Sequence, residues 1–141
     1  MEQQEKQALA REALSARKRA YAPYSQYRVG AALLGTNGTI YLGCNIENSS
    51  YGATNCAERT AFFKAVSEGC LTFKGIAIAG GPKEEEDKLS DYAYPCGICR
   101  QVMAEFCKED FEILVVKAAD EFETYYLGQM LPSSFTGDKL G

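Results

Sequence analysis

The chain has 141 residues, of which 46% are hydrophobic and 24% charged, and its formal net charge is −4 at pH 7. This composition predicts one soluble globular domain spanning residues 1–141. The negative charge disfavours nucleic-acid binding, which depends on clustered cations. No apolar run approaches the roughly 20 residues of a membrane span, and the N-terminus lacks the features of a secretion signal, so we expect a cytoplasmic protein without membrane contact.

The N-terminal third predicts a helix followed by a β-hairpin. Apolar residues recur at helical spacing in residues 1–22, immediately before a proline, which indicates an amphipathic helix. Residues 29–34 and 39–44 are extended runs. The Asn37-Gly38 pair between them favours a two-residue turn, so we expect the two runs to form a hairpin.

The middle of the chain predicts a loop, a helix and a buried strand. Residues 45–55 are polar and lead into a helix that should start near Cys56 and end at Gly69, where a left-handed conformation is available. Residues 73–79 form an apolar run typical of a buried strand. The highly charged stretch 80–91 is expected to be a solvated loop or a short exposed helix.

The last third predicts a further helix and two strands. Helical spacing of apolar residues begins at the Pro95-Cys96 corner, and residues 111–116 and 122–127 are rich in strand-forming residues. Counting gives five strands with helices before, between and after them. The expected fold class is therefore α/β, a single three-layer α/β/α domain with a mixed five-stranded sheet.

The chain contains six cysteines and no histidine. Cytosolic thiols stay reduced, so these cysteines are expected to be metal ligands, catalytic groups or small core residues rather than disulfides. Cys44, Cys70 and Cys107 fit the role of small core residues. Without histidine, any acid–base chemistry or metal binding must use carboxylates, thiolates, tyrosine or lysine.

Cys56, Cys96 and Cys99 lie where loops enter predicted helices. Residues three apart share a helical face, so Cys96 and Cys99 can bind one ion, and a helix N-terminus favours the thiolate form. If the two helix starts face each other, Cys56 completes a set of three sulfur ligands. Three protein ligands with an open fourth position are typical of catalytic zinc, so we expect one zinc ion per chain.

Glu58 and Arg59, which follow Cys56 closely in the sequence, could take part in the chemistry of a metal site. Glu58 can project beside the open metal position and shuttle protons without binding the metal. Zn²⁺ with three thiolates carries one net negative charge, which Arg59 can offset by donating hydrogen bonds to sulfur. The alternative for Arg59 is a surface ion pair. Together, Cys-x-Glu and Pro-Cys-x-x-Cys make the three-cysteine version of the zinc deaminase signature.

The sequence resembles the small homotetrameric cytidine deaminases over nearly its whole length. The blocks that carry this resemblance are residues 20–25, 29–33, 43–48, 56–61, 95–101 and 131–135. It implies hydrolytic deamination of cytidine and 2′-deoxycytidine in pyrimidine salvage. It also implies zinc bound by the three cysteines, Glu58 as the proton shuttle and Arg59 in contact with the ligand sulfurs.

The resemblance further implies a set of substrate-binding residues. Asn45 and Glu47 match residues that bind the ribose 3′-hydroxyl, although their residue types alone also fit ordinary turn positions. Ala57 matches a further substrate-binding position. Tyr27 stands where the family commonly has a phenylalanine near the base, which adds a hydroxyl group. Phe135 matches a residue that reaches into a neighbouring subunit, which implies a homotetramer with shared sites. The Glu47 carboxylate would repel a phosphate, so free nucleosides are the expected substrates.

Two alternatives remain open from the sequence. A related deaminase could act on another aminopyrimidine, such as an antibiotic nucleoside or a base within RNA, although an RNA editor should be more basic. A structural zinc or thiol module that binds a partner protein would need a fourth protein ligand and no Glu58. The charged segment 83–88 is longer than the connection common in the family and has no assigned role.

Overall fold

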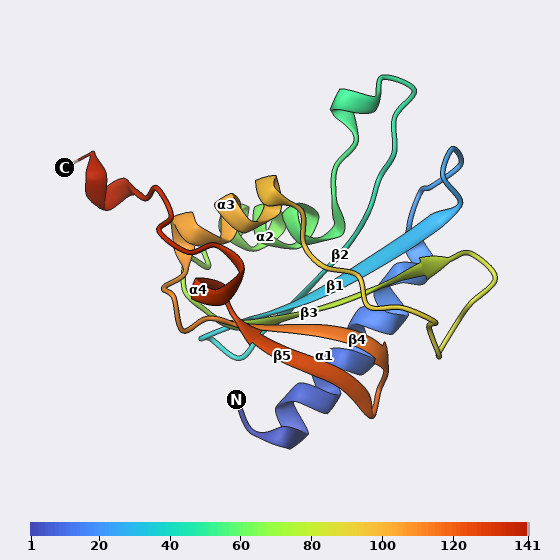
Figure 1. The fold of residues 1–141 in the computed structure, drawn as a ribbon, viewed down its shortest axis with the longest axis horizontal. Coiled ribbons are helices and arrows are strands. Elements are labelled where there is room, and N and C mark those ends of the chain that lie inside the picture. Colours follow the sequence, from blue (N-terminus) through green and yellow to red (C-terminus); the bar gives the residue numbers. More distant parts are fainter. Residues whose placement is uncertain (141) are drawn as a thin grey trace.

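The computed structural model describes residues 1–140, so Gly141 of the expected domain lies outside the described residues. The centre of the fold is a five-stranded sheet (Figure 1). The strand order is β2-β1-β3-β4-β5. Only β3 and β4 pair in parallel, and the other three pairs are antiparallel. The expected mixed α/β sheet is thus confirmed. The strands are β1 (Tyr27–Gly35), β2 (Ile40–Cys44), β3 (Phe73–Pro82), β4 (Glu112–Ala118) and β5 (Glu121–Tyr126).

Helices cover both faces of this sheet, as the sequence predicted. Helix α1 (Gln3–Ala16) lies on one face, and α2 (Ala57–Ser67) and α3 (Gly97–Phe106) lie on the other (Figure 1). A short helix, α4 (Leu127–Met130), follows β5, and single 3₁₀ turns occupy Arg17–Arg19, Tyr51–Ala53 and Gly137–Lys139. None of the helices within residues 1–140 has the length and apolar character that crossing a membrane requires.

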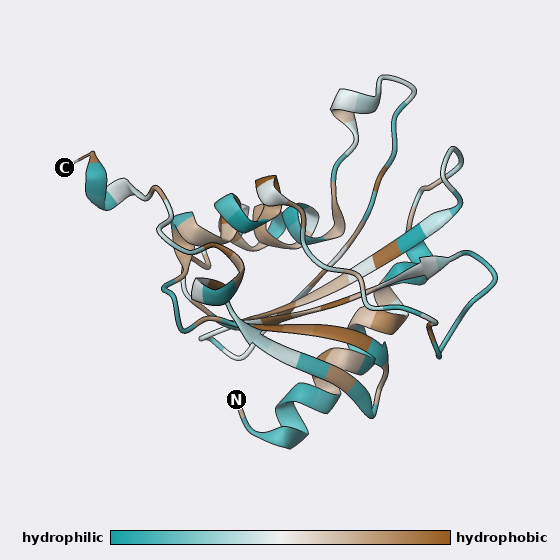
Figure 2. Cartoon of the chain, viewed as in Figure 1, coloured by the Kyte–Doolittle hydropathy of each residue, from teal (hydrophilic) through white to brown (hydrophobic). Residues whose placement is uncertain are grey.

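The alternation of side chains along the strands builds two cores. On β1, Ala31 and Leu33 face α2 and α3, whereas Ala32 and Leu34 face α1. Because successive strand residues point to opposite faces, one strand contributes to both cores. Figure 2 shows the hydrophobic residues concentrated on the strands and on the helix surfaces that meet them. The three-layer arrangement therefore follows from the apolar pattern.

Two predicted local features differ from the structure. Helix α1 ends at Ala16, and a 3₁₀ turn follows before the chain becomes extended at Ala20. The hairpin loop has three residues rather than two, because Gly38 N donates to Gly35 O at 3.0 Å and Gly35 N donates to Thr39 O at 2.9 Å. Within this loop only Gly38 adopts a positive φ, of 85°, which fits a turn followed by one left-handed residue.

The charged stretch 80–91 is not a simple solvated loop. Its first residues extend β3 to Pro82, three residues beyond the predicted end. Leu89 is 3% exposed and packs in the core on the α1 side. Its backbone N donates to Lys117 O at 2.8 Å, which ties the stretch to the end of β4. Residues 83–91 thus form a loop with mostly exposed side chains, as expected, whereas the extension of β3 to Pro82 and the burial of Leu89 were not predicted.

Close packing fixes the start of α2 against β2. A Cβ atom on Gly43 would lie 2.3 Å from Ala57 O and 2.6 Å from Ala61 N, so only glycine allows this approach. Further along α2, Phe62 is fully buried, and its ring centroid lies 5.0 Å from that of Phe73 on β3. Helix α2 therefore sits on the sheet with its first turn held at a defined height.

Candidate metal centre and substrate pocket

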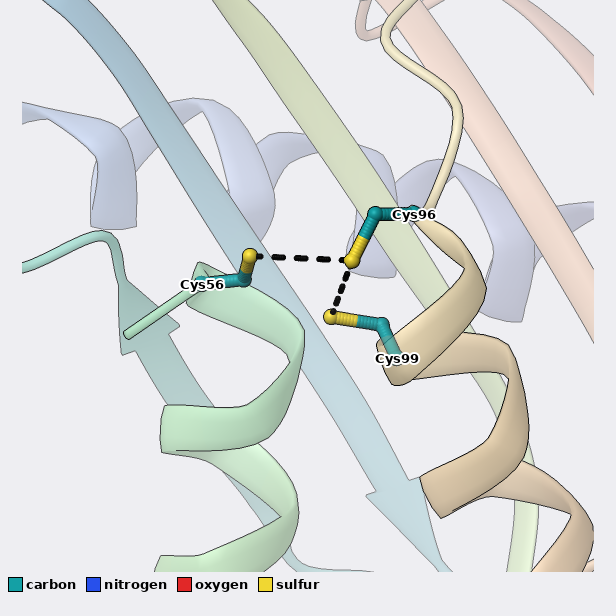
Figure 3. A group of neighbouring side chains, drawn as sticks. All are labelled: Cys56, Cys96 and Cys99. Carbon is teal, nitrogen blue, oxygen red and sulfur yellow. Dashed lines mark hydrogen bonds between the residues drawn. The ribbon is translucent and has the colours of Figure 1, made fainter. Parts of the chain in front are cut away.

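The structure brings the three predicted cysteine ligands together. Cys56 directly precedes α2, and Cys96 directly precedes α3, whose first turn carries Cys99. Figure 3 shows the three side chains pointing toward one another from these two helix starts. The Sγ atoms of Cys56 and Cys96 are 3.9 Å apart, and those of Cys96 and Cys99 are 3.5 Å apart. The two helix starts therefore face each other, which meets the condition for a set of three sulfur ligands.

These distances fit a zinc ion. Tetrahedral ligands at a Zn–S distance of about 2.3 Å lie about 3.8 Å from one another, close to the separations found here. All three Sγ atoms lie within 4.8 Å of one another. A disulfide would need sulfurs about 2.0 Å apart, so the three thiols are free to bind metal. The donor set and its spacing therefore match the expected zinc site.

Hydrogen bonds place negative charge on this cluster. The hydrogen bond from Cys99, assisted by Arg59, lowers the pKa of the Cys56 thiol to about 5. The same contact with Cys56, together with burial, raises the pKa of Cys99. Arg59 Nη2 donates to Cys56 Sγ at 3.3 Å. The Cys56 thiol is therefore the one of the three that most readily becomes a thiolate, the form that binds metal cations.

Arg59 points at the sulfurs rather than at a carboxylate. Its side chain follows Cys56 by one helical turn, which places both on the same face of α2. Within residues 1–140 it forms no ion pair, and its Nε atom is buried without a hydrogen-bond partner. The guanidinium therefore lies where it can offset thiolate charge.

Glu58 lies in the first turn of α2 and is only 4% exposed. Burial, together with the nearby Cys56 thiolate, raises the pKa of its carboxyl to about 7. A carboxyl group in this environment changes protonation near neutral pH. Glu58 also lines the same cavity as Cys56 and Cys96. The structure thus places one proton-carrying group beside the sulfur cluster.

This cavity has a volume of about 510 Å³ and opens beside the cysteines. Three residues predicted to bind substrate also line it, namely Tyr27, Asn45 and Ala57. Val29, on β1, lines it as well. Sequence reasoning missed Thr54, Asn55, Tyr92, Ala93 and Tyr94, which also line it. The signal for the last group was present, because two of the three residues before the Pro95-Cys96 corner are tyrosines.

Asn45 and Glu47 make different contacts and line different cavities. Asn45 is 9% exposed, and its amide bridges to β1: Oδ1 accepts from Val29 N and Nδ2 donates to Tyr27 O, both at 2.9 Å. Glu47 lines a neighbouring cavity of about 370 Å³ together with Tyr24 and Ser25. The two cavities share Thr54 in their walls.

The Glu47 carboxylate is held by the turn that precedes β1. Its Oε1 accepts from Tyr24 N at 2.9 Å and Ser25 N at 3.1 Å, and its Oε2 accepts from the Ser25 hydroxyl. The Ser25 hydroxyl and these backbone groups lower the pKa of Glu47. Glu47 is therefore a fixed anionic acceptor in the neighbouring cavity.

Phe135 does not line the cavity of its own chain. Its side chain is 60% exposed, and its backbone O accepts from Gln101 Nε2 at 2.8 Å. Figure 1 shows the C-terminal tail, drawn in red, extending away from the sheet and helices. The aromatic ring is thus presented to the exterior of the chain.

Comparison with known proteins identifies the family. The model for the cytidine and deoxycytidylate deaminase zinc-binding region matches residues 3–115. Cytidine deaminase of Sporosarcina psychrophila is 48% identical over 132 residues, covering 94% of this chain and 92% of that protein. Probable cytidine deaminase of Dictyostelium discoideum is 43% identical over 140 residues, covering 99% of this chain and 90% of that protein.

A solved structure agrees with these relatives. The crystal structure of cytidine deaminase from Burkholderia pseudomallei superimposes with a TM-score of 0.81 at 42% sequence identity, covering 91% of this chain and 97% of that chain. The chain therefore belongs to the cytidine and deoxycytidylate deaminase family, and its cluster of Cys56, Cys96 and Cys99 is positioned to bind a metal ion, as the zinc-binding region of that family requires.

Proposed function

We propose that this protein is a zinc-dependent hydrolase that deaminates cytidine and 2′-deoxycytidine to uridine and 2′-deoxyuridine, with release of ammonia. The observation that carries the proposal is one cavity that contains two of three thiols at zinc-binding distances together with the buried carboxyl of Glu58. The cavity volume of about 510 Å³ lies in the range common for small-molecule sites. A structural zinc module would not require a buried carboxyl beside the metal.

Glu58 performs the proton transfers of the reaction. When bound, a zinc ion would supply a nucleophile derived from water near neutral pH. Glu58 accepts the proton that water loses as its oxygen bonds to C4 of the cytosine ring, and it delivers a proton to N3. A second transfer lets the amino group leave as ammonia. No histidine is present in the sequence to share these steps.

Arg59 and the N-termini of α2 and α3 stabilise the negative charge of the thiolates. Three thiolates and Zn²⁺ sum to one net negative charge, which the Arg59 guanidinium offsets through its contact with Cys56 Sγ. The backbone N–H groups at the starts of α2 and α3 also favour thiolates. This balance keeps three anionic ligands stable in a partly buried site.

The substrate is a small free nucleoside. Asn45 and Glu47 bind the ribose, Tyr27 offers an aromatic face to the base, and Ala57 contacts the substrate at the start of α2. Support comes from the side chains and backbone that line the two adjoining cavities. The fixed negative charge of Glu47 disfavours a phosphate at the sugar, because two anions would face each other.

We also propose an assembly and a cellular setting. Residues 1–141 form one catalytic domain, and four copies assemble into a homotetramer in which Phe135 of each chain completes a neighbouring site. The exposed Phe135 ring supports such sharing, since it does not reach the cavity of its own chain. The enzyme works in the cytoplasm in pyrimidine salvage.

Incubation of the zinc-loaded protein with cytidine tests the function, with uridine and ammonia measured as products. We expect turnover by the parent and a loss of at least roughly 10²- to 10⁴-fold in kcat for Glu58→Gln, with zinc retained. Glu68→Gln is the matched control, because Glu68 is exposed at the opposite end of α2. A parent without turnover, or a Glu58→Gln protein that is as active as the control, contradicts the proposal.

A further inference from the structure

One buried arginine, Arg17, anchors the segment that follows β3, residues 83–94. Arg17 follows α1 and is only 1% exposed, although arginine is rarely buried to this extent. Its guanidinium lies beneath the end of β3 and the start of the segment 83–94. A buried arginine is costly unless every donor finds a partner, so its contacts show what it stabilises.

All five N–H donors of Arg17 meet backbone carbonyl oxygens. Nε donates to Arg28 O at 3.2 Å, on β1. The two donors of Nη2 meet the last residues of β3, Gly81 O and Pro82 O, both at 2.9 Å. The two donors of Nη1 meet the segment itself, at Glu85 O and at Glu86 O, the latter at 3.2 Å. One side chain therefore joins β1, β3 and the charged segment.

The charge of the segment complements this buried cation. Residues 83–88 contain four acidic and two basic residues, a net charge of −2. No carboxylate of the described part of the chain forms an ion pair with Arg17. Burial and the nearby Arg28 lower the pKa of Arg17, and the negative charges of Glu85 and Asp87 partly oppose this shift. The acidic run thus acts as a diffuse counter-charge, while the carbonyl dipoles replace water.

Beyond the anchor, the segment runs back over the sheet to the cavity. The Glu85 carboxylate accepts from the backbone N and the hydroxyl of Ser90, which closes the turn. Leu89 is buried on the α1 side. The Tyr92 ring then lies 4.5 Å from Lys117 Nζ, measured to the ring centroid, and Tyr92 lines the substrate cavity. The segment is therefore held at both ends of its path.

Packing over Gly80 connects the anchor to the cavity wall. A Cβ atom on Gly80 would lie 2.8 Å from Ala93 Cβ and 3.1 Å from Tyr27 Cε1, so both residues pack on this glycine. Ala93 and Tyr27 both line the cavity. Gly81, the next residue, is bound through its carbonyl by Arg17. A shift of the backbone at Gly81 would move the wall.

We propose that Arg17 is a positioning residue for substrate binding: it holds the segment 83–94 so that Tyr92, Ala93 and Tyr94, near the end of this segment, form one wall of the nucleoside cavity. The inference rests on the proposed function and adds this wall as a determinant of substrate affinity. Aromatic side chains are good surfaces for a nucleobase. Arg17 touches neither the cysteines nor Glu58, so its loss should affect KM more than kcat.

Steady-state kinetics with cytidine tests this split. Arg17→Lys keeps the positive charge but has three donors and no planar fork, so at least two carbonyls lose their partner. We expect KM to rise about tenfold, with kcat within about threefold of the parent and zinc content unchanged. Arg19→Lys is the matched control, since Arg19 lies in the same 3₁₀ turn but is exposed. It should leave both parameters unchanged.

A double-mutant cycle separates positioning from general destabilisation. Tyr92→Ala removes the wall directly and should also raise KM about tenfold. If Arg17 acts through the wall, Arg17→Lys adds little in the Tyr92→Ala background. Multiplicative KM effects, or equal falls in kcat for both variants, would overturn the proposal. If Arg17→Lys does not fold, Ser90→Ala replaces it, because the loss of the Glu85 contact loosens the same segment at an exposed position.

Hydrogen exchange of the unaltered enzyme gives a second measurement, with uridine as the probe. We expect amides of residues 83–94 to gain protection when uridine binds. Unchanged exchange there, together with an unchanged KM in Tyr92→Ala, would overturn the proposal that these residues form a substrate-binding wall. Cytidine turnover by the parent would in that case still support the proposed function. A parent that does not deaminate cytidine overturns the proposed function itself.

Discussion

Replacing Gly43 by alanine should disrupt the active site indirectly, because Gly43 on β2 packs against the first turn of helix α2. The added Cβ would lie 2.3 Å from Ala57 O and 2.6 Å from Ala61 N, whereas ordinary contacts of a Cβ begin near 3.4 Å. The contacting atoms belong to the backbone, so no side chain can turn away. The first turn of α2 must therefore move by about 1 Å (3.4 minus 2.3).

This displacement acts on the residues that the first turn carries. Cys56 Sγ lies 3.9 Å from Cys96 Sγ, which belongs to a different helix and would not follow the movement. A misplacement of about 1 Å typically costs about 10²-fold in rate. Overpacking also costs about 1–3 kcal/mol of unfolding free energy, equivalent to a fall in Tm of about 3–12 °C for a chain of this length. We expect both losses in Gly43→Ala.

Three measurements check this prediction: kcat with cytidine, zinc content and Tm. Gly52→Ala is the control, since a Cβ on Gly52 meets no atom within 4 Å. It should match the parent in all three. A Gly43→Ala enzyme with the kcat and Tm of the parent would refute the argument that close backbone contact sets the position of α2.

Three further changes test other parts of the site. Arg59→Gln should retain zinc but lower kcat by about tenfold or more, because the charge that offsets the thiolates is lost; parental turnover would show that the Cys56 contact has no catalytic consequence. Phe135→Ala should raise KM for cytidine if neighbouring subunits share sites. Mixing Phe135→Ala with Glu58→Gln chains should restore sites that combine an intact Glu58 with an intact partner ring; no recovery after subunit exchange argues against sharing. Cys99→Ala should lose zinc and lower Tm, measured by metal analysis and thermal unfolding, since metal binding is coupled to folding.

The sequence by itself determined the sheet, its covering helices and the candidate metal ligands. Strand and helix periodicities are local properties, and they located all five strands to within a few residues. The spacing of Cys96 and Cys99 placed both thiols on one helical face, and Gly69 ended α2 with a φ of 92° as expected. These features depend on residues close together in the chain, so one sequence is enough to predict them.

Only the tertiary structure decided how distant segments meet. The charged segment 83–88 looked solvated because its composition says nothing of Arg17, which lies more than sixty positions earlier and binds its carbonyls. The wall formed by Tyr92 and Tyr94 depends on that anchor and on the packing of Ala93 over Gly80. Likewise, Asn45 and Glu47 lie two residues apart, yet their side chains line different cavities because each follows its own hydrogen bonds to the backbone. Long-range contacts of this kind leave no periodic pattern, since backbone carbonyls are present at every residue and only the fold selects which ones a buried side chain reaches.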